Sequence, residues 1–190
     1  YTVPGRVTVE VADSDLIGKK DGVVQIFSDT APNGQPVKLT ETLRPGLFRG
    51  FIALVAPTNA PAAGQLRAQA GDFLHAEYLD DSAKGVVRAV AKIDTAAPVI
   101  SRVTISSEYE TALVNWDTSE PTDALVQFGE STFLGRTSYH PELTKHHELR
   151  LVGLRPNRLY YCQVVSRDPA GNTALEDNRG RLYTFRTLKP

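Results

Sequence analysis

The chain has 190 residues, of which 41% are hydrophobic and 23% charged, so it has the composition of a folded globular protein rather than of a disordered one. The net charge is −1, with 10 basic and 11 acidic side chains in residues 1–95 and 11 of each in residues 96–190, and we therefore expect no binding to nucleic acid and no polybasic membrane patch. No apolar run approaches the roughly 18–20 residues of a membrane span.

The length fits two β-domains of about 95 residues each better than it fits one. Cys162 is the only cysteine, so a disulfide within the chain is impossible. The chain contains no Met and starts at Tyr1 already in a strand-like alternation. We therefore expect a piece cut from a longer polypeptide, with any signal peptide removed or lying outside it.

Short alternating runs, separated by Gly, Pro, Asp and Asn, follow one another along the first half and are typical of an all-β sandwich or barrel. Apolar stripes with the helical period of 3.6 residues are lacking, so almost no helix is predicted. The predicted strands of the first half are residues 6–12, 23–28, 37–43, 47–55, 73–79 and 86–93. Turns are expected at Asn33-Gly34 and at Arg44-Pro45-Gly46.

The last of these strands is expected to close the first sandwich, with Val87, Ala89, Ala91 and Ile93 pointing inward. The run DTAAP at residues 94–98 then marks the domain boundary, because Pro disfavours helix before it and supplies no ladder donor. The predicted domains are residues 1–95 and 96–190. Because the linker is short, we expect them to be oriented semi-rigidly.

In the second half, alternation predicts strands at residues 101–106, 112–116, 124–129, 148–152 and 182–187, and a core strand that contains Tyr160, Cys162 and Val164. Trp116 is expected to fill the core, because a buried Trp covers roughly 150–250 Å². Leu154, Pro156 and Tyr160 stand in an L-x-P-x-x-x-Y spacing. A Tyr at such a corner of a sandwich bonds its hydroxyl back to nearby backbone.

With these features in place, residues 98–188 resemble a fibronectin type III domain, of the variety found in secreted bacterial and archaeal proteins, and they are also similar to the N-terminal domain of purple acid phosphatases. The resemblance is carried by Trp116, by V-x-F-G at 126–129, by the corner of Leu154, Pro156 and Tyr160, by D-x-A-G-N at 168–172 and by F-x-T at 185–187. The adhesive Arg-Gly-Asp tripeptide is absent.

Residues 1–95 resemble the Ig-like repeats of large bacterial surface and secreted proteins. The resemblance is carried by D-x-D-L at 13–16, L-T-E-T at 39–42, G-L-F-R-G at 46–50, G-D at 71–72 and Y-L-D-D at 78–81. The two resemblances imply two tandem antiparallel β-sandwiches that serve as a non-catalytic accessory or spacer region of a larger secreted or cell-surface bacterial protein, such as one with an attached hydrolase. The alternative is a module that binds carbohydrate or a surface protein.

Catalytic motifs such as G-x-S-x-G, H-E-x-x-H, a phosphate loop or a dinucleotide fingerprint do not occur in the sequence. Cys162 is a candidate nucleophile if a His lies beside it. Its alternation with Tyr160 and Val164 instead predicts a core position, where a free Cys acts as a small hydrophobe. We predict no enzymatic activity for this chain.

Histidines at three nearby positions, His140, His146 and His147, raise the possibility of a zinc site. Adjacent His146 and His147 point to opposite faces of a strand, so they do not form a site together. A packing or edge role is expected instead. His75 alternates outward with Glu77 and is expected on a solvated face.

Calcium is the one metal that the sequence suggests, because Asp13 and Asp15 form a D-x-D run at the start of a loop over residues 13–21 and Ca²⁺ takes 6–8 oxygen ligands. The full EF-hand pattern is missing, since no Glu stands at the twelfth position. If the strands alternate in an Ig-like order, Asp72 and Asp94 lie at the same end of the first domain as this loop. The loops at residues 117–123 and 168–172 would point at the same junction. The alternative is that these Asp residues cap turns.

Binding to a partner would require exposed aromatic residues or an exposed strand edge. Tyr109, Phe133, Tyr139 and Tyr161 are candidate aromatic platforms for a polysaccharide, although they are scattered. An exposed edge strand that pairs with a peptide is a further route to partners.

Overall fold

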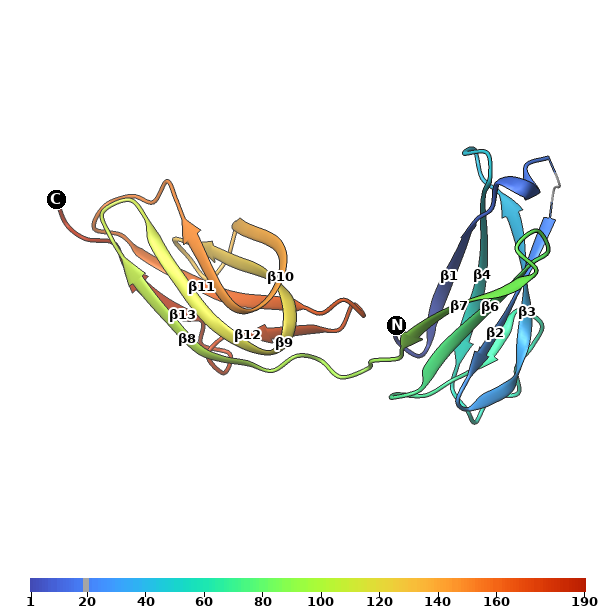
Figure 1. The fold of residues 1–190 in the computed structure, drawn as a ribbon. Coiled ribbons are helices and arrows are strands. Elements are labelled where there is room, and N and C mark those ends of the chain that lie inside the picture. The colour runs from blue at the N-terminus through green and yellow to red at the C-terminus, as the bar shows by residue number, and fades with distance from the viewer. Residues whose placement is uncertain (19–20) are drawn as a thin grey trace. The chain divides into compact units, whose positions relative to one another are not determined.

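The computed structural model describes residues 1–18 and 21–190, and its regular secondary structure is almost wholly β-strand (Figure 1). The chain divides into two compact units, Tyr1–Thr95 and Ala96–Pro190, each with its own hydrophobic core. Within the described residues the single helical element is the 3₁₀ turn η1 (Ser14–Leu16), and no helix there has the length and apolar character needed to span a bilayer. The predicted all-β fold class is confirmed.

Among its described residues, unit 1 contains seven strands in the order β1-β4-β3-β2-β6-β7, with β5 paired parallel to β4. Their bounds are β1 (Gly5–Ala12), β2 (Asp21–Ser28), β3 (Ala31–Glu41), β4 (Leu47–Val55), β5 (Gln65–Arg67), β6 (Phe73–Asp80) and β7 (Gly85–Lys92). β3 pairs with β2 along most of its length and with β4 only at Thr40 and Glu41, so the sheet folds over at this strand. One layer of the sandwich therefore holds β1, β4 and β5, and the other holds β2, β3, β6 and β7.

Alternation along the central strands of unit 1 places one side chain in two inside the sandwich. Val24 and Ile26 of β2 and Ile52 and Leu54 of β4 are each 1% exposed, and they belong to one core cluster. Because residues of both layers share that cluster, the layers face each other. The core of unit 1 lies between them.

The prediction that residues 86–93 close this core is wrong in part. Ile93, just after β7, is fully buried, but Val87 is 57% exposed and Ala89 is exposed as well. Their inward direction follows from the alternation, yet the layer opposite does not reach them.

The expected turn at Asn33-Gly34 is also misplaced. Ser28 pairs with Ala31, so the chain reverses four residues earlier, at Asp29 and Thr30, and Gly34 lies within β3. Gly34 has φ +63°, and the register between β2 and β3 shifts there, as expected of a β-bulge. Gly34 therefore allows an irregularity within β3 and does not form a hairpin turn. In the predicted loop over residues 13–21, residues 19 and 20 lie outside the described residues.

Unit 2 contains six antiparallel strands in one sheet, and the strands differ in length. Their bounds are β8 (Ile100–Ser107), β9 (Ala112–Gly129), β10 (Arg136–Leu151), β11 (Leu159–Arg167), β12 (Thr173–Glu176) and β13 (Tyr183–Arg186). The start of β9 pairs with β8 and the end of β10, whereas its second half pairs with the start of β10 and with β11. β9 and β10 thus run through both layers of the second sandwich.

Two separate strands were predicted over residues 112–129, and the beginning of β10 was not predicted at all. Pro121 and Pro141 lie where β9 and β10 pass from one layer to the other, near the register shifts of their pairing. Residues 136–146 are mostly polar and largely exposed, so they carry no apolar alternation by which the strand could be recognised.

The core of unit 2 is built from β9, β10 and β11 and is covered on both sides. Trp116, Tyr160 and Cys162 are at most 1% exposed, and Leu154 is 3% exposed. Pro156 is half-buried. The Trp116 indole stacks on the His147 ring, with centroids 5.0 Å apart, and donates from Nε1 to Ser166 Oγ at 3.0 Å.

Candidate functional site

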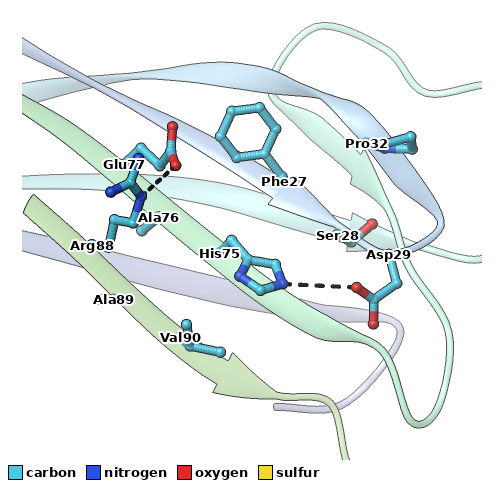
Figure 2. A pocket seen from close by; sticks show the side chains of 10 residues that line it. All are labelled: Phe27, Ser28, Asp29, Pro32, His75, Ala76, Glu77, Arg88, Ala89 and Val90. Carbon is cyan, nitrogen blue, oxygen red and sulfur yellow. Dashed lines mark hydrogen bonds and ion pairs between the residues drawn. The ribbon is translucent and has the colours of Figure 1, made fainter. Parts of the chain in front are cut away.

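The outer face of the second layer of unit 1 carries a shallow pocket of about 560 Å³ (Figure 2). It lies over β2, β6 and β7, on the side of the sheet that faces away from the core. The lining residues are Phe27, Ser28, Asp29, Pro32, His75, Ala76, Glu77, Arg88, Ala89 and Val90.

Strand register explains why these side chains meet. Phe27 of β2 pairs with His75 of β6, and His75 pairs with Val90 of β7, so the three form one row across the outer face. Glu77 and Arg88 pair in the next row. Because successive side chains point to opposite faces, residues two apart on each strand join the same surface. Residues from three separate parts of the sequence are thus brought together.

An ion pair and a contact between a histidine and a carboxylate are held in this pocket. Arg88 Nε donates to Glu77 Oε1 at 2.8 Å, and His75 Nε2 lies 3.7 Å from Asp29 Oδ1. Figure 2 shows the His75 ring turned toward the Asp29 carboxylate and the Arg88 guanidinium against Glu77. The second Asp29 oxygen accepts from the Phe73 amide at 2.8 Å, which fixes its position at the end of β2.

The Phe27 ring is held from one side by the bulge in β3. A Cβ placed on Gly34 would lie 2.6 Å from Phe27 Cδ1, a distance at which one of the two groups must shift. The bare Gly backbone therefore packs against the ring. Phe27 is thereby fixed as an apolar platform beside the Arg88–Glu77 ion pair and the His75–Asp29 contact.

Ser28, His75 and Asp29 are the three residue types of a serine-hydrolase triad, but their geometry is not that of a triad. Ser28 is 2% exposed, and its hydroxyl donates to the Arg67 carbonyl at 2.5 Å and accepts from the Ala31 amide at 3.0 Å. His75 points to the opposite face of the sheet. A nucleophile must lie within hydrogen-bond reach of its base, and Ser28 instead fastens the turn between β2 and β3.

The pocket has the chemistry of a site for an uncharged, polar ligand. An aromatic ring offers an apolar surface, and a carboxylate, an imidazole and a guanidinium beside it offer donors and acceptors. The sequence placed His75 and Glu77 on one exposed face, but it did not single out Phe27. The alternation along β2 indicates that Phe27 points outward. Only the pairing of β2 with β6 brings Phe27 beside His75.

Two of the predicted calcium ligands, Asp13 and Asp15, lie in and beside η1. Asp13 Oδ1 accepts from the Asp15 amide at 2.8 Å, and Asp13 Oδ2 accepts from the Tyr78 hydroxyl at 2.6 Å. Burial, together with the Asp13 carboxylate, raises the pKa of Tyr78. Both oxygens of Asp13 thus cap a turn and tie it to β6, as the alternative interpretation of these residues describes.

Asp72 and Asp94 lie at the other end of unit 1. Asp72 is 5% exposed and accepts from the amides of Thr30 and Gln69, while the Asp94 amide donates to the Tyr1 carbonyl. β1 starts beside Tyr1 and leads away over eight residues, about 25 Å at the usual rise of a strand.

The expected gathering of all four residues at one end is therefore wrong. The topological assumption failed because β1 begins, rather than ends, next to the end of β7. In unit 2, Asp168 accepts from the amide and the side chain of Asn172 and so closes its own turn. Calcium binding at the junction stays a prediction, which melting curves in calcium and in a chelator would test.

The histidines considered for zinc separate as the alternation requires. His146 is exposed, and its Nδ1 lies 2.8 Å from Asp117 Oδ1. This contact is the main reason that the pKa of Asp117 is lowered.

His147 is 3% exposed, and its Nε2 lies 3.2 Å from Thr118 Oγ1 and 3.0 Å from Thr122 Oγ1. Burial, aided by neighbouring His146, lowers the pKa of His147. A neutral ring held by hydroxyls and stacked on Trp116 has a packing role.

The remaining sequence candidates lie in the interior of unit 2. The Tyr160 hydroxyl accepts from the Arg155 amide at 2.9 Å and donates to Glu130 Oε1 at 3.3 Å. Cys162 is fully buried, and burial raises the pKa of its thiol to about 12. A thiol so placed is almost wholly protonated at neutral pH and is not a nucleophile.

The aromatic residues proposed as sugar platforms do not form one surface element. Tyr109, Phe133 and Tyr139 are 52%, 84% and 57% exposed, and Tyr161 is half-buried. Tyr139 lies on β10 and donates to Asp123, whereas Tyr109 and Phe133 lie in different loops. Isolated exposed aromatics of this kind are common on protein surfaces.

Comparison with known proteins adds a distant likeness. No protein-family model matches the chain, and no match is found among curated proteins. Among solved structures it is similar to the chicken CNTN1 FN1–FN3 domains, with a TM-score of 0.42 and 13% sequence identity. The match covers 90% of this chain and 57% of that chain, so this chain spans little more than half of that structure. The assignment of the fold rests on the strands and their pairing.

Proposed function

We propose that the chain is a non-catalytic accessory region of a larger secreted or cell-surface bacterial protein, such as one that carries a hydrolase. The proposal is supported by the observation that the reactive side chains have structural roles. Cys162 and His147 are buried in the core of unit 2, and Ser28 fastens a turn of unit 1. Two self-contained units joined by a short segment fit a spacer.

The accessory role is tested by assaying the purified chain on panels of glycoside, ester and peptide substrates. We expect no turnover above that of heat-denatured protein. Turnover that copurifies with the folded chain, and that a His75→Gln variant abolishes, would show that the chain is an enzyme in its own right.

A second candidate function, carbohydrate binding, is favoured by the pocket on the outer face of unit 1. The CH face of a sugar ring packs on an aromatic side chain, and its hydroxyl groups bond to carboxylate and guanidinium groups. Phe27 offers the first and Asp29, Glu77 and Arg88 offer the second, within one surface of unit 1.

Pull-down on insoluble polysaccharides decides between the two roles. If the pocket binds sugar, the wild-type chain is retained and Phe27→Ala lowers the retained fraction several-fold. Phe133→Ala is the matched control, because Phe133 is more exposed and lies in unit 2. No retention on any polysaccharide favours the spacer, and equal loss in both variants contradicts a site at Phe27.

A further inference from the structure

A polar pocket of about 380 Å³ lies in unit 2, where the start of β8 and the segment between β12 and β13 line it together. Its volume falls within the roughly 300–1,000 Å³ of small-molecule sites. The lining residues are Ile100, Ser101, Arg102, Val103, Glu176, Asn178, Arg179, Arg181 and Tyr183. Arginines thus occur at three positions of the lining and a carboxylate at one, so positive charge is in excess.

The segment between β12 and β13 is a loop over residues 177–182 that leaves the sheet and returns to the same edge of β11. Glu176, at the end of β12, pairs with Val164 of β11. Tyr183, at the start of β13, pairs with Cys162, only two residues away on β11. The loop residues have no partner positions on β11, so the loop projects from the sheet beside the pocket.

Two carboxylates hold this loop in one conformation. Asp177 Oδ1 accepts from the Gly180 amide at 2.7 Å. Glu176 Oε1 accepts from the Asn178 amide at 2.8 Å and from the Tyr183 hydroxyl at 3.0 Å. These carboxylate oxygens are therefore bonded to uncharged donors and not to arginine. A loop fixed before binding loses little conformational entropy when a ligand binds.

The arginines of the loop are left without an anionic partner. Asn178, Arg179 and Gly180 are consecutive left-handed residues, with φ of +57°, +59° and +80°. For residues other than Gly this backbone is costly, and it is concentrated at functional sites such as ligand clamps. Arg179 and Arg181 are both exposed, and among residues 1–18 and 21–190 neither guanidinium group pairs with a carboxylate.

The third arginine of the lining comes from β8. Arg102 has φ +54° and lies where the register between β8 and β9 shifts, between Ser101 and Thr104. Its Nε lies 2.6 Å from Asp117 Oδ2, so much of its charge is offset. The unpaired positive charge of the pocket therefore comes from the loop over residues 177–182.

We propose that this pocket is an oxyanion site that takes a phosphate or sulfate group, either as the free ion or as the monoester of a larger molecule. Guanidinium groups form paired, charge-assisted hydrogen bonds to such groups. Arg179 and Arg181 flank Gly180 in the sequence and supply two guanidinium groups from one fixed loop. The site belongs to unit 2 and does not depend on the pocket around Phe27 in unit 1.

The test follows the amide chemical shifts of the full chain during titration with inorganic phosphate, inorganic sulfate and acetate at constant ionic strength. We expect phosphate and sulfate to cause saturable shifts in residues 101–103 and 178–183, and acetate to bind about five-fold more weakly or less. Shifts that do not saturate, or equal binding of acetate, would overturn the proposal. Glucose 6-phosphate identifies the source of the group, since tighter binding than inorganic phosphate indicates a monoester and equal binding indicates the free ion.

Two variants of the loop locate the site. Arg179→Gln and Arg181→Gln each remove a charge from an exposed side chain and should weaken the binding of inorganic phosphate about five-fold or more. Arg150→Gln is the matched control, because Arg150 is an exposed arginine of unit 2 that does not line the pocket, and its phosphate binding should be unchanged. Unchanged binding in both loop variants would contradict a site at this loop.

Glu176→Gln adds a test that a folding defect cannot imitate, because it should strengthen binding. The substitution removes the carboxylate of the lining but keeps a side-chain oxygen to accept from Asn178 and Tyr183. We expect inorganic phosphate to bind about three-fold more tightly or better, since a nearby negative charge is lost. Unchanged or weaker binding, in a variant with the wild-type spectrum elsewhere, would mean that the ligand does not lie in this pocket.

Discussion

β7 in unit 1 and β11 in unit 2 carry the same kind of alternation, but they end in opposite environments. Tyr160, Cys162 and Val164 of β11 are at most 1% exposed, whereas Val87 of β7 is 57% exposed. β11 is paired on one side with β9 and on the other with β12 and β13, while β7 pairs, in the part of the chain that the structure describes, with β6 alone. Alternation therefore sets the direction of a side chain, and cover by the opposite layer decides whether it is buried.

Trp116→Ala should have the largest effect, because it removes the largest side chain of the covered core. Trp116 is 1% exposed, stacks on His147 and bonds to Ser166. We expect unit 2 to lose about 3–5 kcal/mol of unfolding free energy. Urea unfolding measures this loss, followed by far-UV circular dichroism because the variant lacks the tryptophan fluorescence signal.

Phe133→Ala provides the control for this change, since Phe133 is 84% exposed. Its unfolding free energy should stay within about 0.5 kcal/mol of the wild type. A similar loss in both variants would mean that Trp116 does not anchor the core.

A pair of valine truncations tests the comparison of the two strands directly. Val164→Ala in β11 removes buried methyl groups and should cost about 2 kcal/mol. Val87→Ala in β7 should cost less than about 0.5 kcal/mol, because Val87 is largely exposed. Equal losses in urea unfolding would show that the Val87 side chain is buried in solution.

Tyr160→Phe isolates the hydrogen bond of the corner from the burial of the ring. The Arg155 amide would lose its acceptor, and we expect a loss of about 1.5 kcal/mol. Tyr109→Phe, on an exposed residue, is the matched control and should be neutral. If Tyr160→Phe leaves the unfolding free energy unchanged in thermal or urea unfolding, the hydrogen bond of the corner does not stabilise unit 2.

Acid should destabilise unit 2 through His147. Its folded-state pKa is lowered by burial, so below the unfolded value of about 6.5 the unfolded chain binds the extra proton and stability falls. The loss from this one group is at most about 1.4 kcal/mol at pH 5.5. His147→Gln should flatten the slope of the unfolding free energy of unit 2 between pH 7.5 and 5.5, whereas His75→Gln, which changes a residue of unit 1, should leave that slope unchanged.

Much of the strand content was readable from the residues themselves, and the failures have local causes. Apolar alternation in residues 6–12, 47–55 and 73–79 located strands of unit 1 to within one residue at each end. The polar start of β10 gave no such signal. Asn33-Gly34, a common turn dipeptide, instead forms a bulge, because the turn had already occurred at Asp29 and Thr30.

The candidate sites were less readable than the strands. The phases of β2 and β6 each placed a polar or aromatic residue outward, but the pairing of Phe27 with His75 is a contact between residues 48 positions apart. Likewise, the grouping of Asp13 with Asp72 failed because it depended on which end of β1 lies beside β7. Relations of this kind are long-range, and one sequence contains no direct measure of them.

The sequence by itself determined the β-sandwich class, the phase of most strands, and the core character of Trp116, Tyr160 and Cys162. These are properties of a two-residue period and of side-chain hydrophobicity, which act locally. Only the tertiary structure decided which inward faces are covered and which outward faces meet. Burial and pairing need a second strand from elsewhere in the chain, and β7 has such a neighbour on one edge only.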